Sequence, residues 1–209
     1  MKITKWGYIV LFLFLILNTK AQNFEIGYEL GFGKTGWYYS YSKLKAITFL
    51  DDSGPKSFRT GFLAYFSPDS LFISIKSGLI YIQMISNDLN NLKIIQLPIG
   101  ADIQLGKKKH FIIGGGLYFN YLMSNKITDI TFQNNQIGLY ANIGLLFPIN
   151  TKMSIDFKVL YGYDLTKIYT EESYSPIGGL FSTDTYSTNL NIVITLRYKL
   201  ITGTNNKYK

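Results

Sequence analysis

Apolar and polar residues alternate with a period of two in eight separate segments of the chain. This is the pattern of a β-strand that buries one face. Each segment is about ten residues long, which is enough for a tilted strand to cross a bilayer. The segments are residues 24–32, 58–66, 71–81, 95–103, 113–121, 137–145, 155–162 and 190–199.

The connections between these segments alternate between short and long. Three are tight turns rich in Pro, Gly, Asp or Ser, at 67–70, 106–109 and 148–152. The other four are longer. Short turns at one end and long loops at the other are typical of an outer-membrane barrel, whose turns and two termini lie in the periplasm. The longer connections span residues 34–57, 83–92, 123–135 and 164–187.

The two faces of the predicted strands differ in charge. One set of positions is apolar and nearly free of charge, whereas the other carries glycines and ionisable residues. A soluble barrel has its apolar set inside, and a membrane barrel has it outside. We therefore predict an all-β, eight-stranded, antiparallel up-and-down transmembrane β-barrel with small and polar residues in the lumen. The ionisable set is Glu25, Glu29, Arg59, Lys76, Asp102, Asp156, Lys158, Arg197 and Lys199.

The N-terminus has the three parts of a secretory signal peptide. Lys2 and Lys5 precede an apolar run over residues 6–17, and small residues follow at Thr19 and Ala21. Cleavage after Ala21 leaves residues 22–209 as the barrel domain. The alternative is a membrane-spanning helix, which needs about 20 apolar residues.

Composition narrows the possible chemistry. The 209 residues include 16% charged and 16% aromatic residues, no cysteine and one histidine, with a net charge of +8. A disulfide framework and a thiolate metal site are therefore excluded. The remaining lysines are scattered except at 107–109, and we expect no nucleic-acid partner. The partners we expect are the lipids of the outer membrane and another envelope protein.

We expect neither an active site nor a cofactor. His110 begins a strand at the short-turn end, where no nucleophile is placed for it to activate. The triple glycine at 114–116 lies inside an alternating strand and not at a phosphate-binding turn. Five acids in the long loops could gather a hard cation, although solvated loop charge is the preferred interpretation. These acids are Asp51, Asp52, Glu171, Glu172 and Asp184.

Closure of the ring predicts an ion-pair cluster in the lumen. The first and last strands must be neighbours, because no strand edge can face lipid. Glu25 and Glu29 should then lie at depths similar to Arg197 and Lys199. The alternative is four solvated charges near the periplasmic rim, which pair only weakly.

Aromatic residues gather in two of the long loops. They would form either the outer aromatic belt of a membrane barrel or a contact surface for a partner. The candidates for interaction are Trp37, Tyr38, Tyr39, Tyr41, Tyr169 and Tyr174.

Four strand motifs, in this order and spacing, resemble the PorT-type outer-membrane β-barrel family of Bacteroidota. They are IQLPIG at 95–100, FIIGGGLY at 111–118, IGLYANIG at 137–144 and YGYDL at 161–165. Two features depart from the family pattern. Gly115 replaces a frequent proline, and the chain continues past the last strand. The resemblance implies an outer-membrane barrel, and one branch of the family is linked to protein secretion.

These patterns favour a non-enzymatic barrel in the bacterial outer membrane, with a filled lumen, that acts as a structural or interaction protein through its long loops. An open pore is disfavoured, because side chains fill an eight-stranded barrel. Two alternatives remain open: an accessory component of outer-membrane secretion or transport, and a soluble exported barrel that binds an apolar ligand.

Overall fold

The computed structural model describes residues 22–41, 55–68, 72–85, 92–105, 110–123, 126–127, 130–131, 133–175 and 179–201. The predicted signal peptide, residues 1–21, lies outside these ranges. Within the described residues, no helix is long and apolar enough to cross a membrane.

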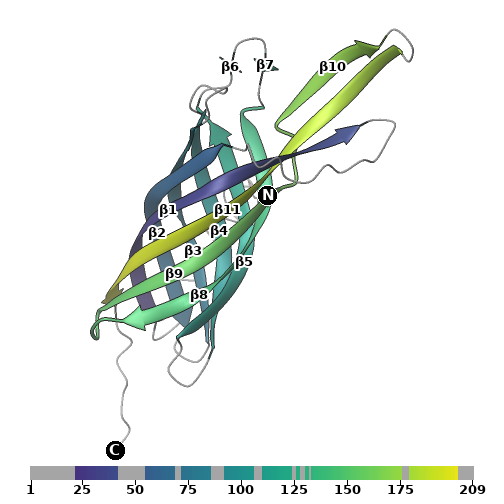
Figure 1. Ribbon diagram of the computed structural model, residues 1–209. Coiled ribbons are helices and arrows are strands. Elements are labelled where there is room, and N and C mark those ends of the chain that lie inside the picture. Colours follow the sequence, from purple (N-terminus) through teal and green to yellow (C-terminus); the bar gives the residue numbers. More distant parts are fainter. Residues whose placement is uncertain are drawn as a thin grey trace, which may run out of the picture.

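Eight long antiparallel strands form a closed barrel, as predicted (Figure 1). Neighbours along the chain pair with one another, and the first strand pairs with the last, which closes the ring. The barrel strands are β1 (Gln22–Tyr41), β2 (Lys56–Pro68), β3 (Ile73–Ile85), β4 (Leu92–Leu105), β5 (Phe111–Leu122), β8 (Asn135–Pro148), β9 (Met153–Asp164) and β11 (Gly179–Ile201).

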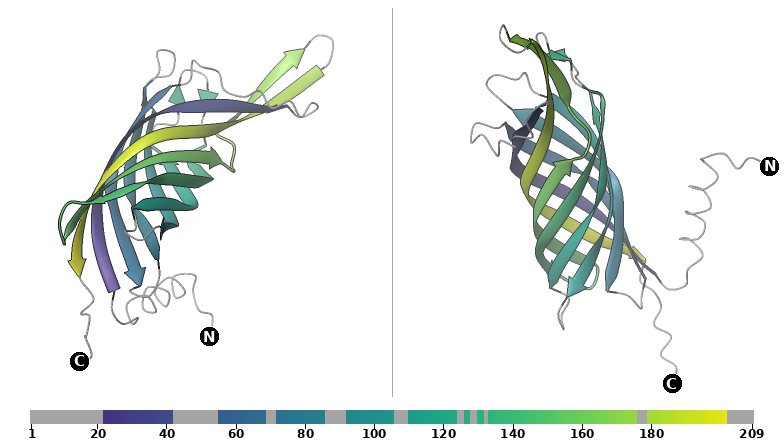
Figure 2. Two further views of the ribbon diagram at one scale, coloured as in Figure 1. Left: turned by 60° about the horizontal axis from the view of Figure 1, so that its bottom comes forward. Right: turned by 90° about the vertical axis from the view of Figure 1, so that its right-hand side faces the viewer.

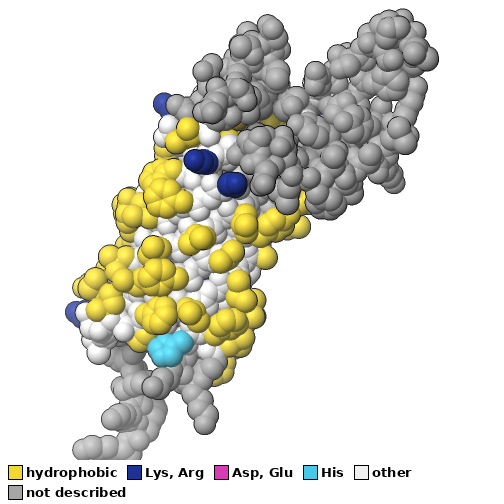
Figure 3. Space-filling model, viewed as in Figure 1, with side chains coloured by type: hydrophobic (Ala, Val, Ile, Leu, Met, Phe, Trp, Pro, Cys, Tyr) yellow, Lys and Arg dark blue, Asp and Glu magenta, His cyan; other side chains and the backbone are white. Residues whose placement is uncertain are grey.

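The apolar set of every strand faces outward, and the polar and glycine set faces the lumen. Phe32 and Ile192 are each 66% exposed, whereas Asp102 and Asp156 are fully buried. Apolar side chains accordingly cover the outer wall (Figure 3). Because an exposed apolar wall is stable only against lipid, the predicted assignment of faces to a membrane barrel is confirmed.

The two ends of the barrel differ. The turn end carries the connections 69–72, 106–110 and 149–152. In the last of these, the Asn150 Oδ1 accepts hydrogen bonds from the backbone N–H groups of Lys152 and Met153, each 2.8 Å long. This side chain closes the turn as an Asx motif does. The opposite end is called the loop end below.

The strands extend further at the loop end than the alternation predicted. β1 continues to Tyr41 and β11 begins at Gly179, so parts of 34–57 and 164–187 are strand and not loop. β11 pairs there with β1 on one side and with β10 (Tyr169–Ser175) on the other. This three-stranded arm projects beyond the barrel (Figure 2). Two further strands of two residues each, β6 (Lys126–Ile127) and β7 (Ile130–Thr131), pair with each other as a short hairpin.

Sequence alternation missed the arm because only the bilayer-length part of each strand needs a charge-free outer face. Beyond the lipid, β-favouring Thr and Tyr residues can pair without that pattern.

Lumen glycines make room for large neighbours. A Cβ at Gly138 would overlap the ring of Tyr118, and one at Gly114 would overlap the carboxylate of Asp102. Both glycines face inward on strands that pair with each other. Gly114 therefore has the packing role that was predicted for the triple glycine at 114–116.

Candidate functional site

A network of buried charges crosses the half of the lumen next to the turn end, called the turn half below. Arg197 on β11 forms an ion pair with Asp156 on β9, and its Nε donates a 2.6 Å hydrogen bond to Asp156 Oδ2. Lys158 Nζ lies 3.3 Å from the same carboxylate oxygen. All three side chains are almost completely buried. Burial of charge is tolerable only with such partners.

Asp102 connects this group to the other side of the barrel. Lys76 Nζ on β3 donates a 2.6 Å hydrogen bond to Asp102 Oδ1, and Asn142 on β8 donates one of 3.1 Å to the same oxygen. The Oδ2 atom lies 3.7 Å from Arg197 and 4.0 Å from Lys158. One carboxylate thus holds side chains from four other strands.

The charges of this network balance once Glu25 is included. Glu25 Oε2 lies 3.8 Å from Arg197 Nη1. Three cations then face three anions, so the network is neutral overall. The cations are Lys76, Lys158 and Arg197, and the anions are Glu25, Asp102 and Asp156.

Tyr65, which is fully buried, provides an aromatic face for the same cations. The Arg197 guanidinium lies 3.9 Å from the centre of the Tyr65 ring, which is a cation–π contact. Lys158 Nζ is 3.4 Å from the Tyr65 hydroxyl oxygen. The cations are therefore held by a ring as well as by carboxylates.

A second polar chain crosses the middle of the lumen. Arg59 Nε on β2 donates a 2.8 Å hydrogen bond to Glu29 on β1, and its Nη2 reaches Gln96 on β4 at 3.3 Å. Gln96 donates to Asn120 at 3.0 Å, and Asn120 donates to Gln136 at 3.5 Å. This chain of side chains links β1 with β8.

The predicted cluster of Glu25, Glu29, Arg197 and Lys199 forms only in part. Arg197 contacts Glu25 but pairs more closely with Asp156, and Glu29 pairs with Arg59. Lys199 lies opposite Glu25 in the register, yet no ion pair joins the two, although both are among the described residues. The prediction considered only the β1–β11 seam, whereas each inward side chain also reaches the strand on its other side.

The half of the lumen next to the loop end, called the loop half, is apolar on one side. Inward-facing side chains of β3, β4 and β5 form a buried cluster there. Ile168, from the connection after β9, packs into the same cluster and is only 3% exposed. The backbone N–H of Ile168 donates to Thr185 O at 2.7 Å, which fixes the connection. The apolar plug consists of Ile82, Met84, Leu92, Ile94, Leu122 and Ile168.

Polar contacts line the remaining wall of the loop half. The Tyr118 hydroxyl donates a 2.5 Å hydrogen bond to Asp164, and Ser187 donates to the other oxygen of that carboxylate. A cavity of about 30 Å³ lies deeper in the lumen, lined by polar side chains such as Arg59 and Lys76 and by apolar ones such as Leu63 and Ile82. That volume holds about two water molecules, which is far less than a solute channel needs.

The backbone register places the aromatic candidates of the arm, although their side chains are outside the described residues. Tyr39 and Tyr169 lie opposite Thr185, one on each side of β11. Trp37 lies opposite Ser187. Tyr174 lies opposite Leu180, further along the arm. The remaining two candidates, Tyr38 and Tyr41, lie opposite Tyr186 and Thr183.

The candidate cation site lies mostly outside the described residues. Of its five acids only the Asp184 side chain is described, and Asp184 pairs with Lys167 at 3.2 Å. No group of three or more His, Cys, Asp or Glu side chains could hold a metal ion within the described part of the chain. His110 lies at the turn end, where its Nδ1 is 2.8 Å from Leu146 O.

Comparison with known proteins identifies the fold. No protein-family description matches the sequence, and no curated protein matches it. Neisserial surface protein A superposes with a TM-score of 0.51 at 15% identity, covering 85% of this chain and 97% of that one. Outer membrane protein AlkL, determined in lipid bilayers, gives 0.50 at 9% identity, covering 88% and 93%. OprG from Pseudomonas aeruginosa gives 0.45 at 14% identity, covering 87% and 98%.

At these identities the likeness shows the fold alone. The chain is an eight-stranded, antiparallel, closed β-barrel of the type found in bacterial outer-membrane proteins, with its apolar wall outside and its charges inside.

Proposed function

We propose that this chain is a non-enzymatic outer-membrane β-barrel with a filled lumen, which acts as a structural or interaction protein through its loop end. The charge network carries the proposal. Asp102 is held from β3, β8, β9 and β11, so bonded side chains cross the lumen in several directions. A lumen closed in this way favours a function at the surface of the barrel over the passage of solutes through it.

The apolar outer wall supports an outer-membrane location with lipid as the partner around the barrel. The ends of β1 and β11 next to the N- and C-termini lie at the turn end. In membrane barrels that end faces the periplasm, which directs the loop end outward. The soluble, ligand-binding alternative required the apolar set to face inward, and it is set aside because that set is exposed.

The arm is the surface best placed for a protein partner. It extends β1, β10 and β11 past the barrel and carries the aromatic candidates along its backbone (Figure 1). The resemblance to the PorT-type family agrees with an envelope role. An accessory role in secretion would use the same surface, since it requires contact and not a pore.

Conductance across a planar bilayer tests the filled lumen. The wild-type barrel should show no steady ion current, because two polar chains and the apolar plug block its interior. The double variant Arg197→Ala, Asp156→Ala removes one cation and one anion, and its current should rise above that of the wild type. A stable current through the folded wild type would contradict the proposal.

Site-specific photo-cross-linking in cells tests the interaction surface. A cross-linker at position 38 of the arm should form a protein adduct. The control position is 159, because Val159 faces lipid and is 45% exposed. Adducts at 159 alone, or at neither position, would argue against a partner at the loop end.

A further inference from the structure

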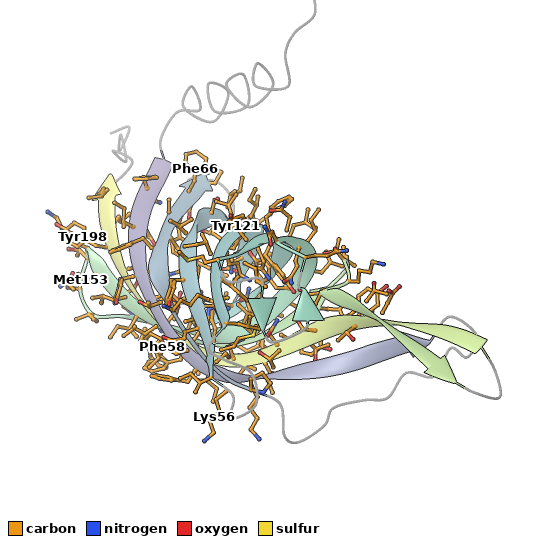
Figure 4. The ribbon with its side chains drawn as sticks, turned by 90° about the horizontal axis from the view of Figure 1, so that it is seen from above. Lys56, Phe58, Phe66, Tyr121, Met153 and Tyr198 are labelled. Atoms are coloured by element: carbon orange, nitrogen blue, oxygen red, sulfur yellow. The ribbon has the colours of Figure 1, made fainter. Side chains whose placement is uncertain are left out.

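The arm has two edges with which no other described strand pairs. β11 lies in its middle, with β1 on one side and β10 on the other. The pairing of β1 with β2 ends at Thr35, and beyond it β1 pairs with β11 alone among the described strands. Seen from above, the arm extends clear of the ring of barrel strands (Figure 4). An unpaired edge of this kind is a template for an added strand.

The backbone of β1 presents hydrogen-bonding groups on this edge, called the β1 free edge below (residues 36–41). The N–H of Thr35 points away from β11, because it donates a 3.0 Å hydrogen bond to Pro55 O. The register between β1 and β11 has no bulge from Glu25 to Tyr41, so every second residue after Thr35 also points away from β11. Each of these residues offers one N–H donor and one C=O acceptor to an added strand. They are Trp37, Tyr39 and Tyr41.

The β1 free edge lacks the features that protect exposed edges from pairing. Its sequence is GWYYSY, which contains neither a charge nor a proline, and Trp and Tyr favour strands. The other edge strand of the arm, β10, instead carries Glu171 and Glu172 next to each other. Because charged residues on an edge oppose the addition of a strand, the contrast favours β1 as the edge that accepts one.

The outer edge of β10 provides a matched control. Thr185 on β11 faces β10, because its carbonyl accepts a 2.7 Å hydrogen bond from the N–H of Ile168. Tyr169 is the register partner of Thr185 and therefore faces β11. The residues that alternate with Tyr169 direct their backbone groups to the outer edge. They are Thr170, Glu172 and Tyr174.

The direction of β1 disfavours a second copy of this chain as the added strand. β1 runs away from the turn end along its whole length (Figure 1). All copies in one membrane share that direction, whereas an antiparallel pair of β1 strands requires opposite directions. Parallel pairing remains open to a neighbouring copy but is less stable per residue. A segment of a different protein has no such restriction.

We infer that the β1 free edge binds an extended, uncharged segment of another protein at the cell surface, as an added antiparallel β-strand. This inference rests on the proposed function, which places the arm outside the cell and gives it a protein partner. Backbone hydrogen bonds would hold the segment, as in other cases of strand addition. β-Branched or aromatic residues of the segment would form favourable cross-strand pairs with the Trp and Tyr residues of β1.

A fluorescent peptide of alternating Val and Thr residues, with an uncharged Gly-Ser tail, tests this inference on the full barrel in nanodiscs. Fluorescence anisotropy measures its affinity for the wild type and for two matched variants. Tyr39→Pro removes an N–H from the β1 free edge, and Tyr174→Pro removes one from the outer edge of β10, both at positions where an edge strand tolerates proline. Tyr39→Pro should weaken binding roughly tenfold, and Tyr174→Pro should leave it unchanged.

Amide hydrogen exchange measured by NMR shows whether the arm is intact and where the peptide adds. The amides of Tyr38 and Ser40 face β11 and should exchange slowly in the wild type and in both variants. The amides of Tyr39 and Tyr41 should exchange fast in the wild type alone and slowly once the peptide is bound. A peptide N-methylated at every second residue lacks the donors of one edge and should not bind.

Several results would overturn the inference. They are equal losses of affinity in the two variants, full binding of the N-methylated peptide, and slow exchange at Tyr39 and Tyr41 without peptide, which would mean that the chain covers its own edge. Wild-type dimers that Tyr39→Pro dissociates would assign the edge to a second copy. A wild type that binds no peptide, yet blocks current and forms protein adducts at position 38, would refute this inference alone and leave the proposed function standing.

Discussion

Inward-facing side chains are stabilised in different ways in the two halves of the lumen. In the turn half, the buried charges of the network are each stabilised by partners of opposite sign. In the loop half, inward-facing residues of β3 to β5 are apolar and pack around Ile168. The first arrangement depends on charge and the second on volume. An inward-facing position in a membrane barrel is therefore not polar by rule.

The largest expected effect comes from a change of charge at constant volume in the turn half. Asp156→Asn keeps the shape of the side chain but leaves Arg197 and Lys158 without their closest anion. We expect the free energy of unfolding to fall by about 3–5 kcal/mol. Urea titration of the barrel folded into lipid vesicles measures it, and a loss below about 1 kcal/mol would contradict the network's dependence on charge.

A change of volume should have the next largest effect, in the loop half. Ile94→Ala opens a cavity in the apolar plug, because Ile94 is only 2% exposed, and should cost about 3 kcal/mol. Ile94→Leu conserves volume and should cost less than about 1.5 kcal/mol. The same urea titration compares the two. Equal losses for Ala and Leu would mean that packing volume does not determine stability there.

A smaller effect is expected where a glycine makes room for a ring. Gly138→Ala places a methyl group against Tyr118, which must move, at a cost of about 1–3 kcal/mol. Combination with Tyr118→Leu, which removes the ring, should cost less than the sum of the two single losses. Strict additivity of the two losses would show that the methyl group and the ring do not meet.

The smallest effect is expected for the half-exposed ion pair of the arm. Asp184 pairs with Lys167, and their side chains are 32% and 38% exposed. Solvent weakens such a pair, so Asp184→Asn should change stability by about 0–1 kcal/mol. This variant is also the control for Asp156→Asn, since both replace one carboxylate by an amide. A loss as large as that of Asp156→Asn would remove the distinction between lumen and surface charge.

The sequence predicted the strands and their faces because alternation with a period of two is a local property. It predicted the ion-pair partners less well, because those depend on register around a closed ring. Arg197 lies opposite Gly27 on β1 and Ser154 on β9, so its acids, Glu25 and Asp156, are both diagonal neighbours. Closure of the ring between β1 and β11 predicts only the β1 neighbour.

Two other features lacked a local signal. Ile168 lies outside every alternating segment, so its burial in the apolar plug depends on how the connection after β9 folds back. The arm lacks the charge-free outer face that marked the other strands, so its pairing was not predicted.

The assignment of inside and outside along one strand tests the account most directly. The chain contains no cysteine, so a single introduced cysteine carries a spin label at one known site. Labels placed one at a time along β9 in lipid vesicles report contact with dissolved oxygen, which concentrates among acyl chains. Oxygen accessibility should alternate with a period of two, high at 155, 157, 159 and 161 and low at 154, 160 and 162. The opposite phase, or no alternation, would contradict a barrel with lipid outside and a filled lumen.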